Sequence, residues 1–123
     1  MPPRDLIERT RQFALAVLEF CRTLLRTSDA QEAAGQLRRA ARSVRNNYRA
    51  ARRGRSRAEF QSKLGIVFEE ADECVDWLED LRDAGIGHDA GLLQEARELA
   101  AIFAKALRTA RANTRRLNRL PKS

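Results

Sequence analysis

The chain has 123 residues, with 24 lysines and arginines against 17 aspartates and glutamates, which gives a formal net charge of +7. This length suits one domain with one hydrophobic core, and only three prolines and six glycines interrupt a composition typical of helices. No stretch approaches the roughly 20 apolar residues of a membrane span, and no signal segment is visible. We expect a cytoplasmic, all-α protein with no membrane association and a single domain over residues 1–123.

Apolar residues recur at alternating spacings of three and four in four segments of the chain. The pattern predicts helices over about 5–27, 29–53, 57–84 and 89–117, with a basic tail at 118–123. Each segment begins near a side chain that can cap a helix, namely Asp5, Asp29, Ser56 and Asp89. Because the connections are short, we expect an antiparallel up-down-up-down four-helix bundle. The buried stripe of the last helix is expected to continue through Asn113 to Leu117.

Residues 36–57 carry nine arginines and no acidic residue. In an antiparallel bundle, the end of the second helix, the start of the third and the end of the fourth lie at one pole. Residues 105–123 add seven positive charges and no negative one at the same place. The eight arginines expected to contact phosphates, called here the arginine pole, are Arg49, Arg52, Arg53, Arg55, Arg57, Arg111, Arg115 and Arg116.

These arginines have two interpretations. A dense arginine cluster repels itself unless an anion neutralises it, which favours a phosphate-binding surface. Since Tyr48 is the only aromatic residue near the surface, base stacking should be minor and sequence preference weak. Alternatively, the cations complement the carboxyl ends of helices, while Arg38, Arg42 and Arg45 pair with acids of the third helix or of a neighbouring subunit.

Four further residues lie at the edges of the predicted core. Ile66 and Trp77 are large apolar residues on one flank of the third helix, which indicates an oligomer interface. Ser43 and Asn47 lie at the margin of the second helix, where they either form a buried hydrogen bond that fixes helix register or contact a partner subunit.

The sequence offers little catalytic chemistry. The single histidine, His88, falls in a predicted loop, and the carboxylates Glu70 and Glu73 lie off the core stripe, so a di-iron site is not expected. Cys21 and Cys74 each lie within an apolar stripe, as expected of free buried thiols in a reducing compartment. We expect no enzyme activity, no cofactor and no metal.

The segment Gln36-Leu37-Arg38-Arg39-Ala40-Ala41-Arg42-Ser43-Val44, followed by Asn47, resembles the Q-L-x-R-A-x-x-S-[IV]-x-x-N segment of a bacterial family. This is the four-helix-bundle family of proteins encoded in intervening sequences of 23S ribosomal RNA genes. The resemblance implies an antiparallel protomer that assembles as a ring-like homopentamer without catalytic activity. Related bundles are accessory proteins of diversity-generating retroelements, in which a basic ring engages nucleic acid and a reverse transcriptase.

The chain departs from the family pattern directly after this segment. The family has N-[IV]-x-E-[GA], whereas this chain reads Asn47-Tyr48-Arg49-Ala50-Ala51. A role tied to the missing glutamate is not transferred, and the local charge becomes more positive.

Two functions follow from this sequence. The first is a non-enzymatic, oligomeric protein that binds RNA or DNA phosphates through the arginine pole. The alternative is a structural adaptor ring that binds a protein partner such as a reverse transcriptase and uses its arginines in subunit contacts.

Overall fold

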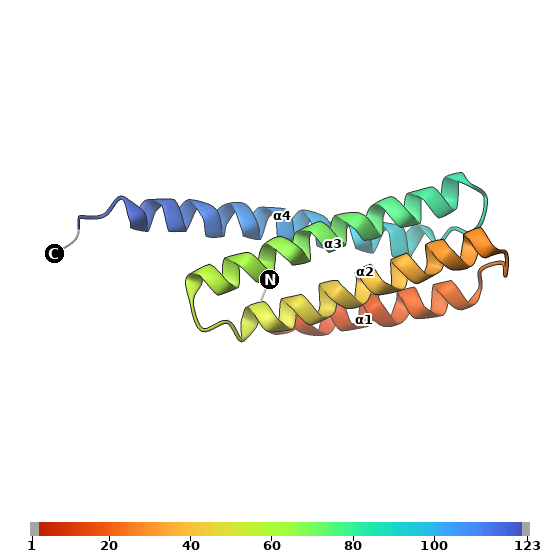
Figure 1. Cartoon of the computed structure of the whole chain (residues 1–123), viewed down its shortest axis with the longest axis horizontal. Coiled ribbons are helices and arrows are strands. Elements are labelled where there is room, and N and C mark those ends of the chain that lie inside the picture. The colour runs from red at the N-terminus through yellow and green to blue at the C-terminus, as the bar shows by residue number, and fades with distance from the viewer. Residues whose placement is uncertain (1–2, 122–123) are drawn as a thin grey trace.

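The computed structural model describes residues 3–121, and all regular secondary structure in that range is α-helical. The helices are α1 (Pro3–Arg22), α2 (Ser28–Arg52), α3 (Arg57–Asp83) and α4 (Ala90–Asn118). Consecutive helices run in opposite directions along the long axis (Figure 1). The prediction of an all-α protein with four helices is confirmed; positions 122 and 123 of the expected tail lie outside the described residues.

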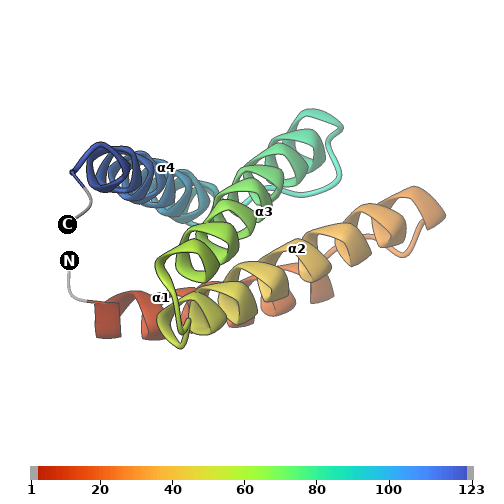
Figure 2. The same cartoon turned by 60° about the vertical axis from the view of Figure 1, so that its left-hand side comes forward.

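The helices contact one another in chain order, with α2 against α1 and α3, and α3 against α4. The contact that closes the bundle, between α1 and α4, is the sparsest, and Figure 2 shows α4 diverging from α1. All four helices contribute fully buried side chains to one core, among them Val17, Leu37, Val67 and Phe103. The periodic apolar stripes therefore face inward, as the sequence predicts.

Helix α1 ends at Arg22, five residues before the expected end. The backbone N–H groups of Thr23 and Leu24 donate to carbonyls three residues earlier, at 3.0 and 3.3 Å, which tightens the final turn. The turn places Leu24 in the core against Gly87 of the α3–α4 loop, so closely that a Cβ at position 87 would clash with it. Leu25, expected in the same stripe, is 59% exposed.

The first two expected caps are wrong. Because α1 already begins at Pro3, Asp5 lies in its first turn rather than at the cap. The cap of α2 is Thr27, whose hydroxyl accepts a hydrogen bond from the N–H of Ala30 at 3.4 Å. Asp29 lies in the first turn and also accepts from Ala30, at 2.9 Å, where its negative charge favours the positive end of the helix dipole.

The caps of α3 and α4 are confirmed. The Ser56 hydroxyl accepts from the N–H of Glu59, and an Asp89 carboxylate oxygen accepts from the N–H of Leu92, both at 3.0 Å. Between α2 and α3, Gly54 lies so close to the carbonyl of Ala51 that a Cβ would come within 3.1 Å of it. A larger residue in this tight turn would therefore require the backbone to shift by a few tenths of an ångström.

Helix α4 continues beyond the core that its first half helps to build. Leu107 is its last buried residue, Asn113 is exposed and Leu117 is half-buried. Figure 1 shows the carboxyl end of α4 extending past the neighbouring ends of α2 and α3. The helical period was therefore predicted correctly, but the last turns have no opposing helix to bury them.

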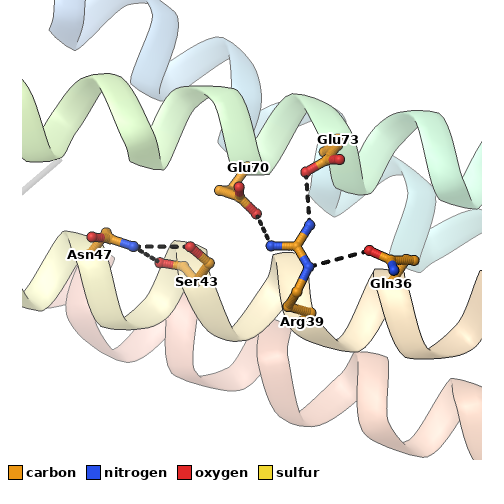
Figure 3. Close-up of polar contacts among 6 residues, drawn as sticks. All are labelled: Gln36, Arg39, Ser43, Asn47, Glu70 and Glu73. Atoms are coloured by element: carbon orange, nitrogen blue, oxygen red, sulfur yellow. Dashed lines mark hydrogen bonds and ion pairs between the residues drawn. The ribbon is translucent and has the colours of Figure 1, made fainter.

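Ser43 and Asn47 form a hydrogen bond within α2, not between helices. The Asn47 amide Nδ2 donates to the Ser43 carbonyl at 3.0 Å and to its hydroxyl at 2.9 Å (Figure 3). Both side chains are half-buried. A bond between residues four apart on one helix cannot set the register of two helices, so that interpretation is wrong.

Both cysteines are free and buried, as predicted. Burial raises the pKa of the Cys21 thiol, which lies 3.7 Å from the Ala34 carbonyl oxygen. Burial also raises the pKa of Cys74, and the nearby carboxylates act in the same direction. Neither thiol is therefore a ready nucleophile at neutral pH.

Candidate nucleic-acid interface

The acids along the middle of the bundle are neutralised by arginines of neighbouring helices. Arg9 of α1 donates to Glu95 of α4 through two nitrogens, at 2.7 and 2.8 Å, and so bridges the sparsest seam of the bundle. Arg97 of α4 donates to Glu79 of α3 at 2.7 Å. These pairs link α1 to α4 and α3 to α4.

A third arginine, Arg39, links α2 to α3. Its guanidinium lies 3.4 Å from a Glu70 oxygen and 3.3 Å from a Glu73 oxygen, and its Nε donates to Gln36 at 3.3 Å (Figure 3). Two acids of α3 thus pair with Arg39. The three arginines predicted for that role form no ion pair with an acidic side chain of the described residues, namely Arg38, Arg42 and Arg45.

The arginine pole is different. No member of the predicted set forms an ion pair with any acidic side chain in the described part of the chain. The end of α2, the start of α3 and the carboxyl end of α4 lie at the same end of the molecule (Figure 1). The charges of these segments are therefore close together and without an acidic partner.

Two adjoining hollows are lined by four of the eight arginines of the pole, Arg49, Arg52, Arg53 and Arg55. The α2–α3 hollow has a volume of about 550 Å³ and is lined by Asn46, Arg49, Ala50, Arg53, Arg55 and Glu59. The α1–α2 hollow has a volume of about 390 Å³ and is lined by Ile7, Arg11, Arg45, Arg49, Arg52 and Arg53. Arg49 and Arg53 line both, so the two hollows form one continuous basic surface along the end of α2.

The structure adds two arginines that the sequence analysis left out of the pole, Arg11 and Arg45. The Nε of Arg45 is buried and has no hydrogen-bond partner. Arg11 pairs with Glu8 at 3.2 Å on the exposed surface of α1. Arg45 could have been found in the sequence from its spacing of four to Arg49, whereas only the packing of α1 on α2 identifies Arg11.

Acidic side chains border these hollows at two points. Glu59 accepts a hydrogen bond from the backbone N–H of Arg55 at 3.3 Å. The pKa of Glu8 is lowered, chiefly by the hydrogen bond from Gln12 and further by the positive charges of Arg11 and Arg45. Both carboxylates are therefore engaged, and the hollows keep a large excess of positive charge.

The remaining predicted residues divide into two groups. Arg57 and Arg111 line a separate α3–α4 hollow of about 620 Å³, together with Ile66 and Thr114. The Thr114 hydroxyl donates to the Gln61 side chain at 2.9 Å and ties α4 to α3 there. Beyond this tie, Arg115 and Arg116 are exposed on the overhanging part of α4 and line none of these three hollows.

No aromatic ring of the described residues lines the basic hollows. Tyr48 is 4% exposed and packs in the core against Phe103, with ring centroids 5.4 Å apart. Of the predicted interface pair, Ile66 is 36% exposed, while Trp77 is half-buried and packs against the core.

The later part of α3 carries the opposite charge. The pKa of Asp76 is raised, first by desolvation and then by the negative charges of Asp72, Glu79 and Asp80. These carboxylates face solvent or lie close to it. Since α3 runs away from the arginine pole, its acidic surface lies toward the other end of the molecule (Figure 1).

Among residues 3–121, no group of three or more His, Cys, Asp or Glu side chains is arranged to hold a metal ion. None of the described helices combines the length and apolar character that crossing a membrane requires.

The fold and the basic surface define a small all-α protein of the four-helix class. The family model described as 23S rRNA-intervening sequence protein matches residues 4–108, so the chain belongs to that family. Its fold is similar to a crystal structure from Bacteroides thetaiotaomicron, described as a protein of unknown function from the S23 ribosomal protein family. That similarity has a TM-score of 0.77 at 24% sequence identity and covers 88% of this chain and 99% of the other. No curated protein matches.

Proposed function

We propose that the chain is a non-enzymatic, oligomeric protein that binds nucleic-acid phosphates through the arginine pole. The observation that carries the proposal is a contrast within the molecule. Three arginines along the middle, Arg9, Arg39 and Arg97, pair with glutamates of other helices. Four arginines of the pole line the two basic hollows without an ion pair, namely Arg49, Arg52, Arg53 and Arg55. Guanidinium groups bind phosphate oxygens through two parallel hydrogen bonds, which suits a surface of this composition.

Contacts of this kind position a nucleic acid without reading its bases. Base stacking needs exposed rings, and Tyr48 is buried in the core. Weak sequence preference and a steep dependence of affinity on salt are therefore expected. Because the family description refers to a 23S rRNA intervening sequence, RNA is the nucleic acid to test first.

We further propose that the antiparallel four-helix protomer assembles as a homopentameric ring through Ile66 and Trp77. A ring would present several arginine poles on one face, and linked sites bind a polyanion more tightly than separate ones. Light scattering on the wild type and on a variant with Ile66→Ser and Trp77→Ala tests the assembly; unchanged oligomeric mass in the variant would refute this interface.

The central experiment is a fluorescence anisotropy titration with single-stranded RNA at several salt concentrations. The pole variant carries four substitutions to glutamine, at Arg49, Arg52, Arg53 and Arg55. Each lost phosphate contact should reduce the slope of log affinity against log salt by about 0.7.

The matched control removes the same number of charges away from the pole, with glutamine at Arg22, Arg26, Arg39 and Arg97. It should leave the slope near its wild-type value. Equal salt slopes in the pole variant, the control and the wild type would refute the proposal.

A second candidate is an adaptor ring that binds a protein partner such as the reverse transcriptase of a diversity-generating retroelement. The acidic surface around Asp76 and the exposed Ile66 favour it. Partner binding that survives the pole substitutions but is lost with Trp77→Ala would select this function over the first.

A further inference from the structure

We propose that the α1–α2 and α2–α3 hollows together form one site for a chain of phosphates, such as the 5′-triphosphate end of an RNA. This inference rests on the proposed function and names the group that the arginine pole prefers. The same chemistry is carried by free tripolyphosphate and by nucleoside triphosphates, and the experiment separates these sources.

The geometry suits a linear anion. Arg45 and Arg49 lie four residues apart on α2, and Arg53, four residues further on, is its C-cap, so the three arginines follow one another along the end of the helix. All three line the α1–α2 hollow, and the last two also line the α2–α3 hollow. The arginines therefore form a row about two helical turns long, which can contact successive phosphates of one chain.

The charge favours a polyphosphate over an internal phosphodiester. Six arginines line the two hollows, and two engaged carboxylates, Glu8 and Glu59, stand beside them. An internal phosphodiester brings about one negative charge, whereas a terminal phosphate brings about two at neutral pH. Each further phosphate in a chain adds to this, so a triphosphate end neutralises far more of the cluster.

Arg45 extends the row of arginines into the α1–α2 hollow, which it lines beside Arg49. Neither arginine forms an ion pair with an acidic side chain of the described residues. The Arg45 Nε is buried and has no acceptor there, although buried polar groups in proteins are nearly always hydrogen-bonded. Because a phosphate in the open hollow cannot reach this buried atom, the expected contact is with the terminal nitrogens of the guanidinium.

The test compares three RNAs of one sequence that carry a 5′-triphosphate, a 5′-monophosphate or a 5′-hydroxyl. At moderate salt we expect the triphosphate RNA to bind at least tenfold more tightly than the hydroxyl RNA, with the monophosphate RNA between them. Equal binding of all three would overturn this inference and leave the proposed function standing.

Two pairs of substitutions locate the site. Arg11→Gln with Arg45→Gln should weaken the binding of all three RNAs, but should weaken the triphosphate RNA most, so that the ratio of its affinity to that of the hydroxyl RNA falls close to one. The control, Arg57→Gln with Arg111→Gln in the α3–α4 hollow, should weaken all three RNAs and keep their ratio. A preference retained by the first pair would refute the assignment. If the glutamine variant does not fold, the same three affinities are measured on Arg11→Lys with Arg45→Lys, which keeps the charge.

Free anions complete the experiment. Sodium tripolyphosphate should compete with the triphosphate RNA and should raise the melting temperature more than sulfate of equal ionic strength does, in a manner that requires Arg45. If it does so while no RNA binds, the hollows are a site for free polyphosphate and the proposed function fails. If it neither competes nor stabilises, the site itself is refuted.

Discussion

The same residue type has two different surroundings in this molecule. Along the middle of the bundle, Arg9, Arg39 and Arg97 each hold a glutamate of another helix. At the end of α2, Arg49 and Arg53 line open hollows without an ion pair. The difference comes from where the acids fall along α3 and α4, because those helices carry their glutamates opposite the first group and few opposite the second. An arginine's role is thus decided by the register of the helix beside it.

The largest effect is expected from reversing the charge of the two arginines that line both hollows. Arg49→Glu with Arg53→Glu should lower RNA affinity about 100-fold or more at low salt, because two phosphate contacts are replaced by two repelling carboxylates. Arg22→Glu with Arg26→Glu, at the end of α1, is the control with the same change in charge. A comparable loss in the control would show that net charge alone matters.

Removing a paired arginine should act on stability instead. Arg9→Gln leaves Glu95 without its main partner, and both side chains are about three-quarters buried, at 24% and 29% exposure. We expect the free energy of unfolding in urea to fall by about 1–2 kcal/mol, between the values for exposed and buried pairs. The salt slope of RNA binding should stay unchanged.

A double-mutant cycle with Glu95→Gln separates the pair from the individual residues. The combined variant should lose less stability than the sum of the single variants. Additive losses would mean that the two side chains do not interact energetically.

The ion pair between Arg39 and Glu70 should affect how the stability of the protein depends on pH. Burial raises the pKa of Glu70, and Arg39 is the main influence that lowers it again. A carboxyl with a raised folded-state pKa contributes stability below its ordinary value of 4.5, and this is lost as the pH rises through the raised pKa.

Arg39→Gln should therefore steepen the fall in melting temperature over that range, and Glu70→Gln should flatten it. Identical pH profiles of the two variants would contradict this assignment. At neutral pH the cost of Arg39→Gln should be small, about 0.5 kcal/mol, because the arginine is 53% exposed.

The smallest expected effect has the opposite sign. Arg49→Gln removes like-charge repulsion with Arg45 on α2 and with Arg53 at its C-cap, each four residues away, so the protein should gain a few tenths of a kcal/mol. Urea midpoints measured at low and high salt check this, since screening should remove the gain. A loss of stability at low salt would show that Arg49 has a stabilising contact.

Sequence reasoning succeeded for most local signals, although Asp5 and Asp29 are not the caps of α1 and α2. The caps at Ser56 and Asp89 depend on the hydrogen bond to a backbone N–H three residues later, and the structure contains both. The burial of Leu64, Val67 and Cys74 follows from their spacing on one helix. Each prediction needed only neighbours within a few residues.

It failed where distant segments meet. Helix α1 ends early, close to the point where Leu24 packs against Gly87 of the α3–α4 loop. Residues 5–27 contain no signal that predicts this contact. Arg39, and not Arg38 or Arg42, pairs with Glu70 and Glu73 of α3. The hydrophobic period of a helix does not determine how that helix is rotated against its neighbour, so the sequence did not predict this pairing. The α1–α2 hollow was missed for the same reason, since Arg11 joins it through the packing of two helices.

The overhang of α4 has a consequence for motion. Up to Leu107 the helix is held by the core, and Thr114 makes the last tie to α3 through Gln61. Beyond that tie, backbone amides are protected only by the helix's own hydrogen bonds, so they should exchange with deuterium through local fraying, while those around Phe103 exchange only when the bundle opens. The two arginines carried there, Arg115 and Arg116, therefore lie on the part of α4 that is expected to open most readily.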